Sequence, residues 1–352
     1  MKNHTNIEIS GRKIGPSEPP FVIAELSGNH NGDLDRAIRL IELAAEAGVD
    51  AVKLQTYTAD TITLDHDGPE FLIHGGLWKG QRLYDLYQDA HTPWEWHAKL
   101  FARAKELGVI IFSSPFDETA VDFLEELDCP AYKIASFECI DTPLIQKCAA
   151  TKKPLIISTG LANQTEILEA VITASEGGAN GIALLHCVSA YPANSENYNL
   201  RTIPFLQSNY NIPVGLSDHS LGTATAVASI PLGACIIEKH VTLDRSEGGP
   251  DAAFSLEPQE VAQLVNDCRS AWQSLGEIQV DAVEAEKENR QFRRSLYVVE
   301  NINKGAELTT ENVRSIRPGF GLPPNNLAKV LESRAAHDLS KGTALTWDDI
   351  EN

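Results

Sequence analysis

Basic residues are scarce in this chain of 352 residues. It has 29 Lys and Arg against 49 Asp and Glu, which gives a formal net charge of -20. Nucleic acids and anionic membrane surfaces are bound through basic patches, so this balance argues against both as partners. Any anionic substrate must therefore be held by a few local cations against the field of the whole protein.

Long apolar runs are also missing. No run approaches the ~20 residues of a membrane-spanning helix, and the polar start MKNHTNIEIS does not have the pattern of a signal peptide. The six cysteines form no C-x-x-C pair, and several lie in apolar runs, as buried thiols do. We therefore expect reduced cysteines and a cytoplasmic protein.

The chain does contain a series of short apolar runs that each end on a polar, charged or small residue. A helical pattern follows each run, and eight strand–helix units predict a closed (β/α)8 TIM barrel with its active site at the carboxyl ends of the strands. Such a barrel takes ~250 residues, so a smaller second module is expected. The runs are FVIAEL (21–26), AVKLQT (51–56), VIIFSS (109–114), AYKIAS (131–136), PLIIST (154–159), IALLHC (182–187), VGLSDH (214–219) and CIIEKH (235–240).

The predicted organisation has three parts. The barrel, with an N-terminal hairpin that plugs its closed end, is expected over residues 1–280, a charged linker over 281–294, and a small α+β module over 295–352. The module contains two similar pieces, NINKGAELTTENV and DLSKGTALTWDDI, each predicted as a Lys-Gly turn followed by a helix that begins at Thr. Residues 57–93 form an aromatic-rich insertion after the second strand, which is predicted to be a lid or wall of the site.

Alternation along the strands indicates which ionisable residues face the barrel interior. Successive side chains point to opposite faces, so an inward Lys53 brings Gln55 inward as well. In the eighth strand His240 shares a face with Glu238, whereas Lys239 points the other way. We therefore expect Lys239 beneath the helices, in an ion pair.

Two histidines end neighbouring strands. Inward imidazoles from His219 and His240 suit a divalent metal with open positions for water and substrate. The alternative is a pair of structural histidines. With only two protein nitrogens the metal would be weakly held, and oxygen-rich surroundings admit Mn²⁺ or Mg²⁺ as readily as Zn²⁺.

Two lysines end the second and fourth strands. A lone buried ammonium is costly, so Lys53 and Lys133 must be paired, deprotonated or bound to an anion. We predict a site for phosphate and carboxylate; the open alternatives are a Schiff-base lysine and lysines that Glu25 and Glu138 merely neutralise. The serines near the same strand ends are Ser114, Ser136, Ser158 and Ser217.

Three carboxylates complete the candidate set. Glu25 and Glu138 are candidates for general acid or base. Asp251, after the eighth strand, is either a ligand for sugar hydroxyls or an ordinary turn residue. So many inward ionisable groups argue against a non-enzymatic sugar-binding protein.

Seven motifs, in order, resemble those of the sialic acid synthase family, and the resemblance covers essentially the whole chain. The tail 295–352, with KGAELT and RPGFGL, resembles the antifreeze-like (SAF) domain of that family. The motifs are AELSGNHNG (24–32), AVKLQTY (51–57), AYKIASFE (131–138), ISTGL (157–161), GLSDHS (215–220), EKHVTLD (238–244) and GPDAAFS (249–255).

The resemblance implies an activity and roles for residues. Members condense phosphoenolpyruvate with an N-acylated amino sugar to give a nine-carbon 2-keto acid and phosphate. Glu25 matches the catalytic acid or base, with Glu138 close by, and Arg317 matches an arginine that reaches the neighbour's sugar in a domain-swapped homodimer. The other matches are His219 and His240 for the metal, Lys53, Ser114, Lys133, Ser136, Ser158 and Ser217 for phosphoenolpyruvate, and Gln55, Tyr191 and Asp251 for the sugar.

Two segments indicate a branch of the family. HCVSAYP (186–192) has Ser189 where typical N-acetylneuraminate synthases have Asn, and GLWKGQRLYDLYQDAHTPWEWH (76–97) resembles the pseudaminic acid synthase branch. That branch implies 2,4-diacetamido-2,4,6-trideoxy-L-altrose as the sugar. The alternatives are an N-acetylneuraminate or legionaminic acid synthase and, from another class, a Schiff-base aldolase. The aromatic residues expected to face such a sugar are Trp78, Tyr84, Tyr87 and Trp94.

Overall fold

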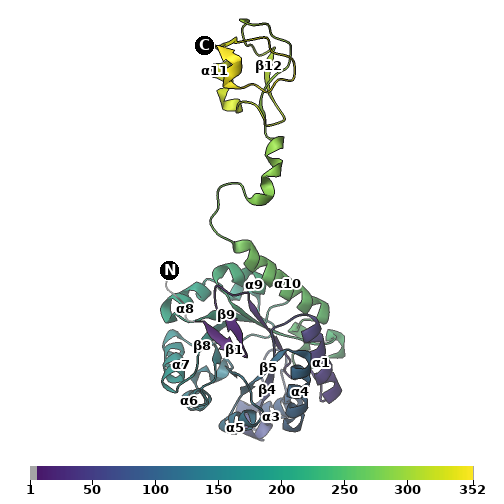
Figure 1. Cartoon of the computed structure of the whole chain (residues 1–352). Coiled ribbons are helices and arrows are strands. Elements are labelled where there is room, and N and C mark those ends of the chain that lie inside the picture. The colour runs from purple at the N-terminus through teal and green to yellow at the C-terminus, as the bar shows by residue number, and fades with distance from the viewer. Residues whose placement is uncertain (1–5, 352) are drawn as a thin grey trace. The chain divides into compact units, whose positions relative to one another are not determined.

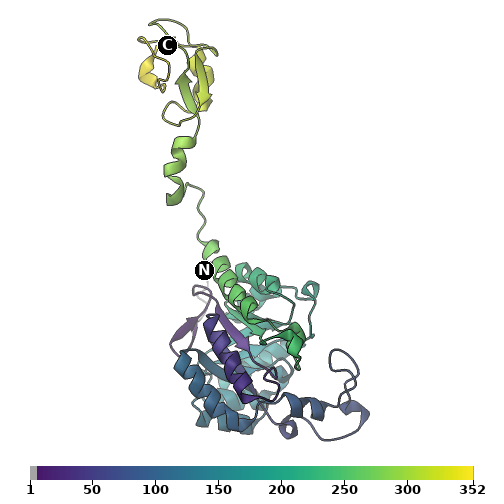
Figure 2. The same cartoon turned by 90° about the vertical axis from the view of Figure 1, so that its right-hand side faces the viewer.

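The computed structural model describes residues 6–351, and Figures 1 and 2 show its helices and strands. The chain divides into two compact units between Gly276 and Glu277. All six cysteines are free and buried, as expected of reduced thiols. Within residues 6–351 no helix is both long enough and apolar enough to span a membrane.

The first unit is a closed barrel of eight parallel strands in chain order, with the last strand paired to the first. Each strand begins within one residue of its predicted start, so the predicted TIM barrel is confirmed. Strand residues are buried on both faces, because side chains fill the interior and helices cover the outside. The strands are β3 (Phe21–Glu25), β4 (Ala51–Thr56), β5 (Ile110–Pro115), β6 (Tyr132–Ile134), β7 (Leu155–Ser158), β8 (Ile182–Cys187), β9 (Val214–Asp218) and β10 (Ile236–His240).

A helix follows each barrel strand, and these helices form the outer layer in Figure 1. The first shows why they form where they do. The side chain of Asp33 accepts hydrogen bonds from the first free backbone N–H groups, and buried residues recur at three- and four-residue spacing along one face. The helices are α1 (Leu34–Glu46), α4 (Trp94–Leu107), α5 (Glu118–Glu126), α6 (Thr142–Ala150), α7 (Gln164–Glu176), α8 (Thr202–Tyr210), α9 (Ala224–Ser229) and α10 (Pro258–Leu275).

The predicted N-terminal hairpin consists of β1 (Ile7–Ile9) and β2 (Arg12–Ile14). Its turn, Ser10–Gly11, has positive φ at both residues, which suits a tight two-residue hairpin. The isoleucines of both strands belong to the barrel core. Arg12 Nε lies 2.9 Å from Asp50 Oδ1, just before β4 begins, so the hairpin packs against the N-terminal ends of the strands.

The insertion between β4 and α4 has little regular structure. It contains α2 (Ala59–Ile62), the one-turn helix η1 (Pro69–Phe71) and α3 (Leu83–Ala90). Arg82 forms ion pairs with three aspartates of the same segment, which tie its loops together. Figure 2 shows the insertion extending from the edge of the barrel.

The second unit is a small module of short strands. β11 (Ser295–Val298) pairs with β12 (Val313–Ile316), and β13 (Arg334–Ala335) pairs with β14 (Ile350–Glu351), both antiparallel. The only α-helix among its described residues is α11 (Leu327–Leu331), and η9 (Pro324–Asn326) precedes it. Its core is the separate cluster Leu296, Val298, Ile302, Leu308, Val313, Leu322, Val330, Ala335, Leu339 and Leu345.

The internal repeat is present, but the predicted helices after each threonine are wrong. In both pieces the threonine backbone N–H donates to a side chain three residues on, from Thr309 to Asn312 and from Thr346 to Asp349. The next residue already begins β12 or β14, so no length remains for a helix. The second piece forms one turn, η10 (Trp347–Asp349), and the first forms only a turn.

At the start of the second unit, residues 277–294 are exposed throughout. They contain two short helical turns, η7 (Glu284–Glu286) and η8 (Glu288–Phe292).

Candidate active site

Four charged side chains meet inside the barrel, each at most 4% exposed. Glu25, on β3, forms an ion pair with Lys53, on β4, and accepts a hydrogen bond of 2.9 Å from Gln55 Nε2. Glu238 Oε1, on β10, lies 3.8 Å from Lys53 Nζ and 3.6 Å from Lys133 Nζ. The inward direction predicted for Lys53 and Gln55 is therefore correct. Glu238 lies at the centre of the cluster, although it was not among the predicted site residues.

Contacts place three of the four predicted serines, two in the charged cluster and one beside a glycine. Lys53 Nζ donates to Ser114 Oγ at 3.3 Å, and Ser217 Oγ donates to Glu238 Oε1 at 3.1 Å, so both belong to the charged cluster. Ser136 lies beside Gly160, where a Cβ atom would stand 2.7 Å from Ser136 Oγ. A side chain at this position would therefore collide with the serine, and glycine is needed for the close approach.

The two lysines have opposite pKa shifts. Burial by itself lowers the pKa of both, because it disfavours the charged form. At Lys53 the charges of Glu238 and Glu25, with the hydrogen bond to Glu25, outweigh burial, and the pKa lies above its ordinary value. At Lys133 burial, helped by repulsion from Lys53, outweighs the attraction of Glu238, and the pKa lies below it. An anion that binds beside Lys133 would therefore favour its charged form.

Two imidazoles lie at the ends of β9 and β10. The ring centroids of His219 and His240 are 5.3 Å apart, and both residues are less than 9% exposed. His219 Nδ1 lies 3.0 Å from the carbonyl oxygen of Val188. Because a carbonyl can only accept, Nδ1 donates this hydrogen bond, and in the neutral ring Nε2 then keeps its lone pair. His240 Nδ1 lies 3.3 Å from Asp251 Oδ2.

These donors fit a weakly held divalent cation. A hydrogen bond from the second ring nitrogen to a carbonyl is the usual support of a metal-binding histidine. His240 Nδ1 is buried and forms no well-aligned hydrogen bond, although it lies 3.3 Å from Asp251 Oδ2, so its lone pair can serve as a ligand. Within residues 6–351 no group of three or more His, Cys, Asp or Glu has the spacing of metal ligands, so water or substrate would complete the coordination.

Aromatic rings form one side of the histidine pair. The centroid of Tyr191 lies 4.6 Å from that of His219, and Phe254 lies 5.0 Å from His240 and 5.4 Å from Tyr191. The insertion reaches this place, because Trp78 lies 5.5 Å from Tyr191 and its Nε1 donates to the carbonyl of Pro250 at 2.8 Å.

Among residues 6–351, none of the other three aromatic residues expected to face the sugar has a ring contact or hydrogen bond with Tyr191 or the two histidines. Tyr84 donates to Asp60 Oδ1, Tyr87 packs edge-on against Tyr57, and Trp94 stacks on Phe123. Trp78 is therefore the one of the four that contacts a residue beside the histidines. A sequence pattern cannot show which of several nearby aromatic rings faces the site.

Glu138 lies on η2 (Phe137–Ile140), after β6. Burial raises its pKa to about 7, against only weak opposing effects. Apart from Glu25, whose Oε2 is paired with Lys53, Glu138 is one of four residues here with a buried polar atom that lacks a hydrogen-bond partner among the described residues. Buried polar atoms are nearly always satisfied, so such a cluster indicates a place where a ligand binds. The atoms are Glu138 Oε2, Ser158 Oγ, Glu238 Oε2 and His240 Nδ1.

Lys239 and Arg317 lie apart from these groups. Lys239 Nζ is 2.9 Å from Asp218 Oδ2, and both side chains are at most 1% exposed, so the predicted ion pair beneath the helices is confirmed. Arg317 is an exposed residue of the second unit, directly after β12.

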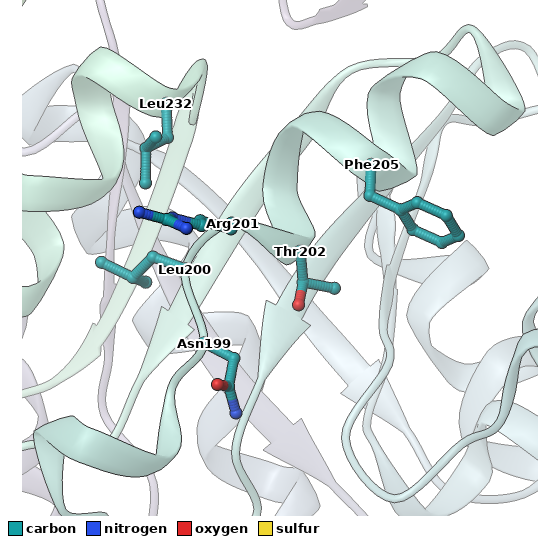
Figure 3. Close-up of a pocket in the computed structure, with 6 residues that line it drawn as sticks. All are labelled: Asn199, Leu200, Arg201, Thr202, Phe205 and Leu232. Atoms are coloured by element: carbon teal, nitrogen blue, oxygen red, sulfur yellow. The ribbon is translucent and has the colours of Figure 1, made fainter.

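Two surface pockets flank the loops after β7 and β8. One, of about 410 Å³, is lined by Thr159, Cys187 and Ser189 among others and adjoins the histidine pair, because Cys187 Sγ lies 3.9 Å from His219 Nδ1. The other, of about 830 Å³, lies at the start of α8, and Figure 3 shows its lining. No predicted site residue lines either pocket.

Comparison with known proteins assigns the chain to a family. The NeuB family model matches residues 40–280, and the SAF domain model matches residues 293–351. This chain belongs to the NeuB family. It is thus an enzyme of the phosphoenolpyruvate-dependent nonulosonic acid synthase family, and the resemblance stated from its motifs is confirmed.

Several NeuB family relatives match nearly the full chain. Pseudaminic acid synthase of Campylobacter jejuni is 43% identical over 94% of this chain and 96% of that protein. N,N'-diacetyllegionaminic acid synthase of Legionella pneumophila is 37% identical over 99% of each. The crystal structure of N-acetylneuraminic acid synthetase from Leptospira borgpetersenii, 33% identical, superposes with a TM-score of 0.73 over 81% of this chain and 95% of that one.

Proposed function

We propose that this NeuB family enzyme is a pseudaminic acid synthase. It condenses phosphoenolpyruvate with 2,4-diacetamido-2,4,6-trideoxy-β-L-altropyranose and water to give pseudaminic acid and phosphate. The observation that carries the choice of sugar is Trp78, which the insertion places against Tyr191 beside the two histidines. Its only N–H donates to Pro250, so Trp78 has only its apolar ring to offer a substrate. A 6-deoxy sugar with two acetamido groups presents methyl groups suited to such a surface.

Phosphoenolpyruvate is held by the cationic part of the site. Lys53 and Lys133 attract its phosphate and carboxylate, and the protein's other charges are mostly negative. Glu25 and Glu238 balance the lysines when no anion is bound. The serines that orient the anion are Ser114, Ser136, Ser158 and Ser217.

The sugar is held on the histidine side. Gln55, Tyr191 and Asp251 contact it, and Asp251 is oriented by Ser27, which donates a hydrogen bond to it. His219 and His240 would hold a divalent cation, Mn²⁺ or Mg²⁺, which supplies Lewis acidity toward the aldehyde oxygen of the open-chain sugar when bound.

The reaction makes one carbon–carbon bond and breaks one carbon–oxygen bond. C3 of phosphoenolpyruvate bonds to the aldehyde carbon, whose oxygen takes a proton and becomes a hydroxyl. Water adds at C2 and gives up one proton. Phosphate then leaves with cleavage of its bond to C2, as the new C2 hydroxyl gives up its proton and becomes the carbonyl of the keto acid. Glu25 transfers these protons, and Lys53 forms an ion pair with it.

A substrate panel tests the proposal. The enzyme is assayed for phosphate release with phosphoenolpyruvate and each of the three candidate sugars, and we expect the 2,4-diacetamido-2,4,6-trideoxy-L-altrose to have the highest kcat/KM. Trp78→Ala should raise KM for this sugar by roughly 10-fold, which corresponds to about 1.4 kcal/mol, and leave KM for phosphoenolpyruvate unchanged. The matched control is Leu77→Ala, an exposed neighbour in the same loop. A preference for N-acetylmannosamine or for the legionaminic acid precursor would refute the proposed sugar.

One observation favours a test of the Schiff-base aldolase alternative. Burial lowers the pKa of Lys133, as a lysine nucleophile requires. Borohydride added during turnover should trap no covalent adduct if the condensation proceeds as proposed. A stable adduct on Lys133 or Lys53 would favour the aldolase.

We further propose a cytoplasmic, domain-swapped homodimer in which Arg317 of one subunit contacts the sugar bound by the other. Its support is the exposure of Arg317 and the small core of the second unit.

A further inference from the structure

The residues directly before the two histidines form a buried ion pair. Asp218 and Lys239 are register partners on β9 and β10, and Lys239 Nζ lies 2.9 Å from Asp218 Oδ2. Successive strand side chains point to opposite faces, so this pair lies on the helix side while His219 and His240 point into the barrel. Whatever fixes the pair therefore also fixes the backbone from which both imidazoles project.

The same two side chains hold the chain on the far side of His219. Asp218 Oδ1 accepts a hydrogen bond of 2.8 Å from the backbone N–H of Ser220, and Lys239 Nζ donates to the carbonyl of Ser220. The backbone N–H of His219 donates to the hydroxyl of Tyr198 at 2.6 Å, and Tyr198 is fully buried. The turn that carries His219 is thus bonded to side chains at three backbone groups: the N–H of His219 and the N–H and C=O of Ser220.

Stability alone is a weak reason for this arrangement. Desolvation of two buried charges offsets most of their attraction, so apolar residues of similar volume often serve a fold as well or better. The next residues on the same side of these two strands, Leu216 and Ile237, are apolar and buried. Orientation of neighbouring groups is the property that a charged, hydrogen-bonded pair supplies and an apolar pair does not.

We propose that Asp218 and Lys239 are positioning residues that set the separation and orientation of His219 and His240. The effect on the orientation of the histidines follows from the contacts above. The effect on metal binding rests on the proposed function, in which these histidines hold a divalent cation. Ligand-orienting contacts of this kind typically change metal affinity by ~10- to 100-fold when they are removed.

The test replaces the pair with apolar residues of similar size. Asp218→Leu/Lys239→Met avoids a lone buried charge, but it leaves the backbone N–H and C=O of Ser220 without their side-chain partners, so we expect it to fold with a lowered melting temperature. Binding of Mn²⁺ to the full-length protein is measured by the electron paramagnetic resonance of free Mn²⁺. We expect ~10- to 100-fold weaker binding in the double variant. Lys153→Met is the matched control, because it breaks an ion pair with Glu125 away from the histidines, and it should bind Mn²⁺ like the parent.

A second measurement needs no metal. In ¹⁵N-histidine-labelled protein, the Nδ1–H resonance of His219, assigned with His219→Ala, reports its hydrogen bond to Val188. The double variant should lose or shift this resonance, and Lys153→Met should keep it. If the double variant does not fold, Tyr198→Phe is measured in the same two ways, because it removes the hydroxyl that accepts from the His219 N–H and also contacts Asp218.

The outcomes distinguish the positioning role of Asp218 and Lys239 from the metal binding in the proposed function. A folded variant with parental Mn²⁺ affinity and an unchanged His219 resonance would overturn the positioning role. A parent protein that binds no Mn²⁺ would count against the metal in the proposed function, and the resonance would then decide the positioning role alone.

Discussion

Replacing Glu238 by Gln tests whether the charged cluster inside the barrel is arranged as the structure shows. Glu238 is the only carboxylate within 4 Å of Lys133 Nζ among residues 6–351, whereas Lys53 keeps its ion pair with Glu25. The variant therefore leaves one buried ammonium without a partner. Breaking a buried pair in this way typically costs about 3–5 kcal/mol. At about 2–4 °C per kcal/mol for a domain of this size, the melting temperature should fall on the order of 10 °C.

The pH dependence of the stability lost in Glu238→Gln identifies the cause of that loss. The pKa of Lys133 is already below its ordinary value, and the variant should lower it further. A lysine whose folded pKa is depressed destabilises the fold at low pH, and the penalty shrinks as rising pH removes its proton. Calorimetry at pH 7 and pH 9.5 should therefore show a larger deficit at pH 7, and inorganic phosphate should restore part of it by pairing with Lys133.

Glu125→Gln is the control for this experiment. It removes a carboxylate from a partly exposed pair with Lys153, where a loss below about 1 kcal/mol is expected. A melting temperature of Glu238→Gln that equals the parent's, or a deficit that is the same at both pH values, would refute the assigned charge balance.

Three further predictions concern the site. The pKa of Glu138 is raised from 4.5 to about 7, so its ionisation costs stability. The free energy of unfolding should therefore fall by up to about 3 kcal/mol as pH rises from about 4.5 to about 7. Urea titrations of Glu138→Gln should not show this dependence on pH. His219→Ala and His240→Ala should remain folded by circular dichroism yet lose activity, and EDTA should inactivate the parent reversibly; full activity in metal-free buffer would contradict the proposed cation. Inactive Arg317→Ala mixed with inactive His219→Ala should regain partial activity through hybrid dimers, and no recovery despite subunit exchange would argue against a swapped assembly.

The barrel could be predicted because its signals are local. Each strand is a short apolar run, and each helix has its own capping residue and apolar face, as α1 does with Asp33. Alternation was sufficient to separate Lys239 from His240, since it depends only on position within one strand. The helices predicted after Thr309 and Thr346 do not form because β12 and β14 begin four residues later. The pairing of these strands is a tertiary constraint, which helix propensity does not include.

The composition of the site was less predictable. Glu238 was placed on the inward face, but its position between Lys53 and Lys133 depends on how three strands, from distant parts of the sequence, close around one interior. Trp78 was one of four plausible aromatic residues, and only the folded insertion brings it to Tyr191 and Pro250.

By itself, the sequence determined the number and order of the strands, the polar residues at their ends and the face on which each side chain lies, because these follow from periodicity within single elements. Tertiary structure alone decided which residues meet: Glu238 lies between two lysines, Asp251 beside His240, and Trp78 against Tyr191. Closure of the barrel brings residues far apart in the chain within 4 Å, and at such distances burial and charge, rather than sequence neighbours, set the protonation and pairing of each group.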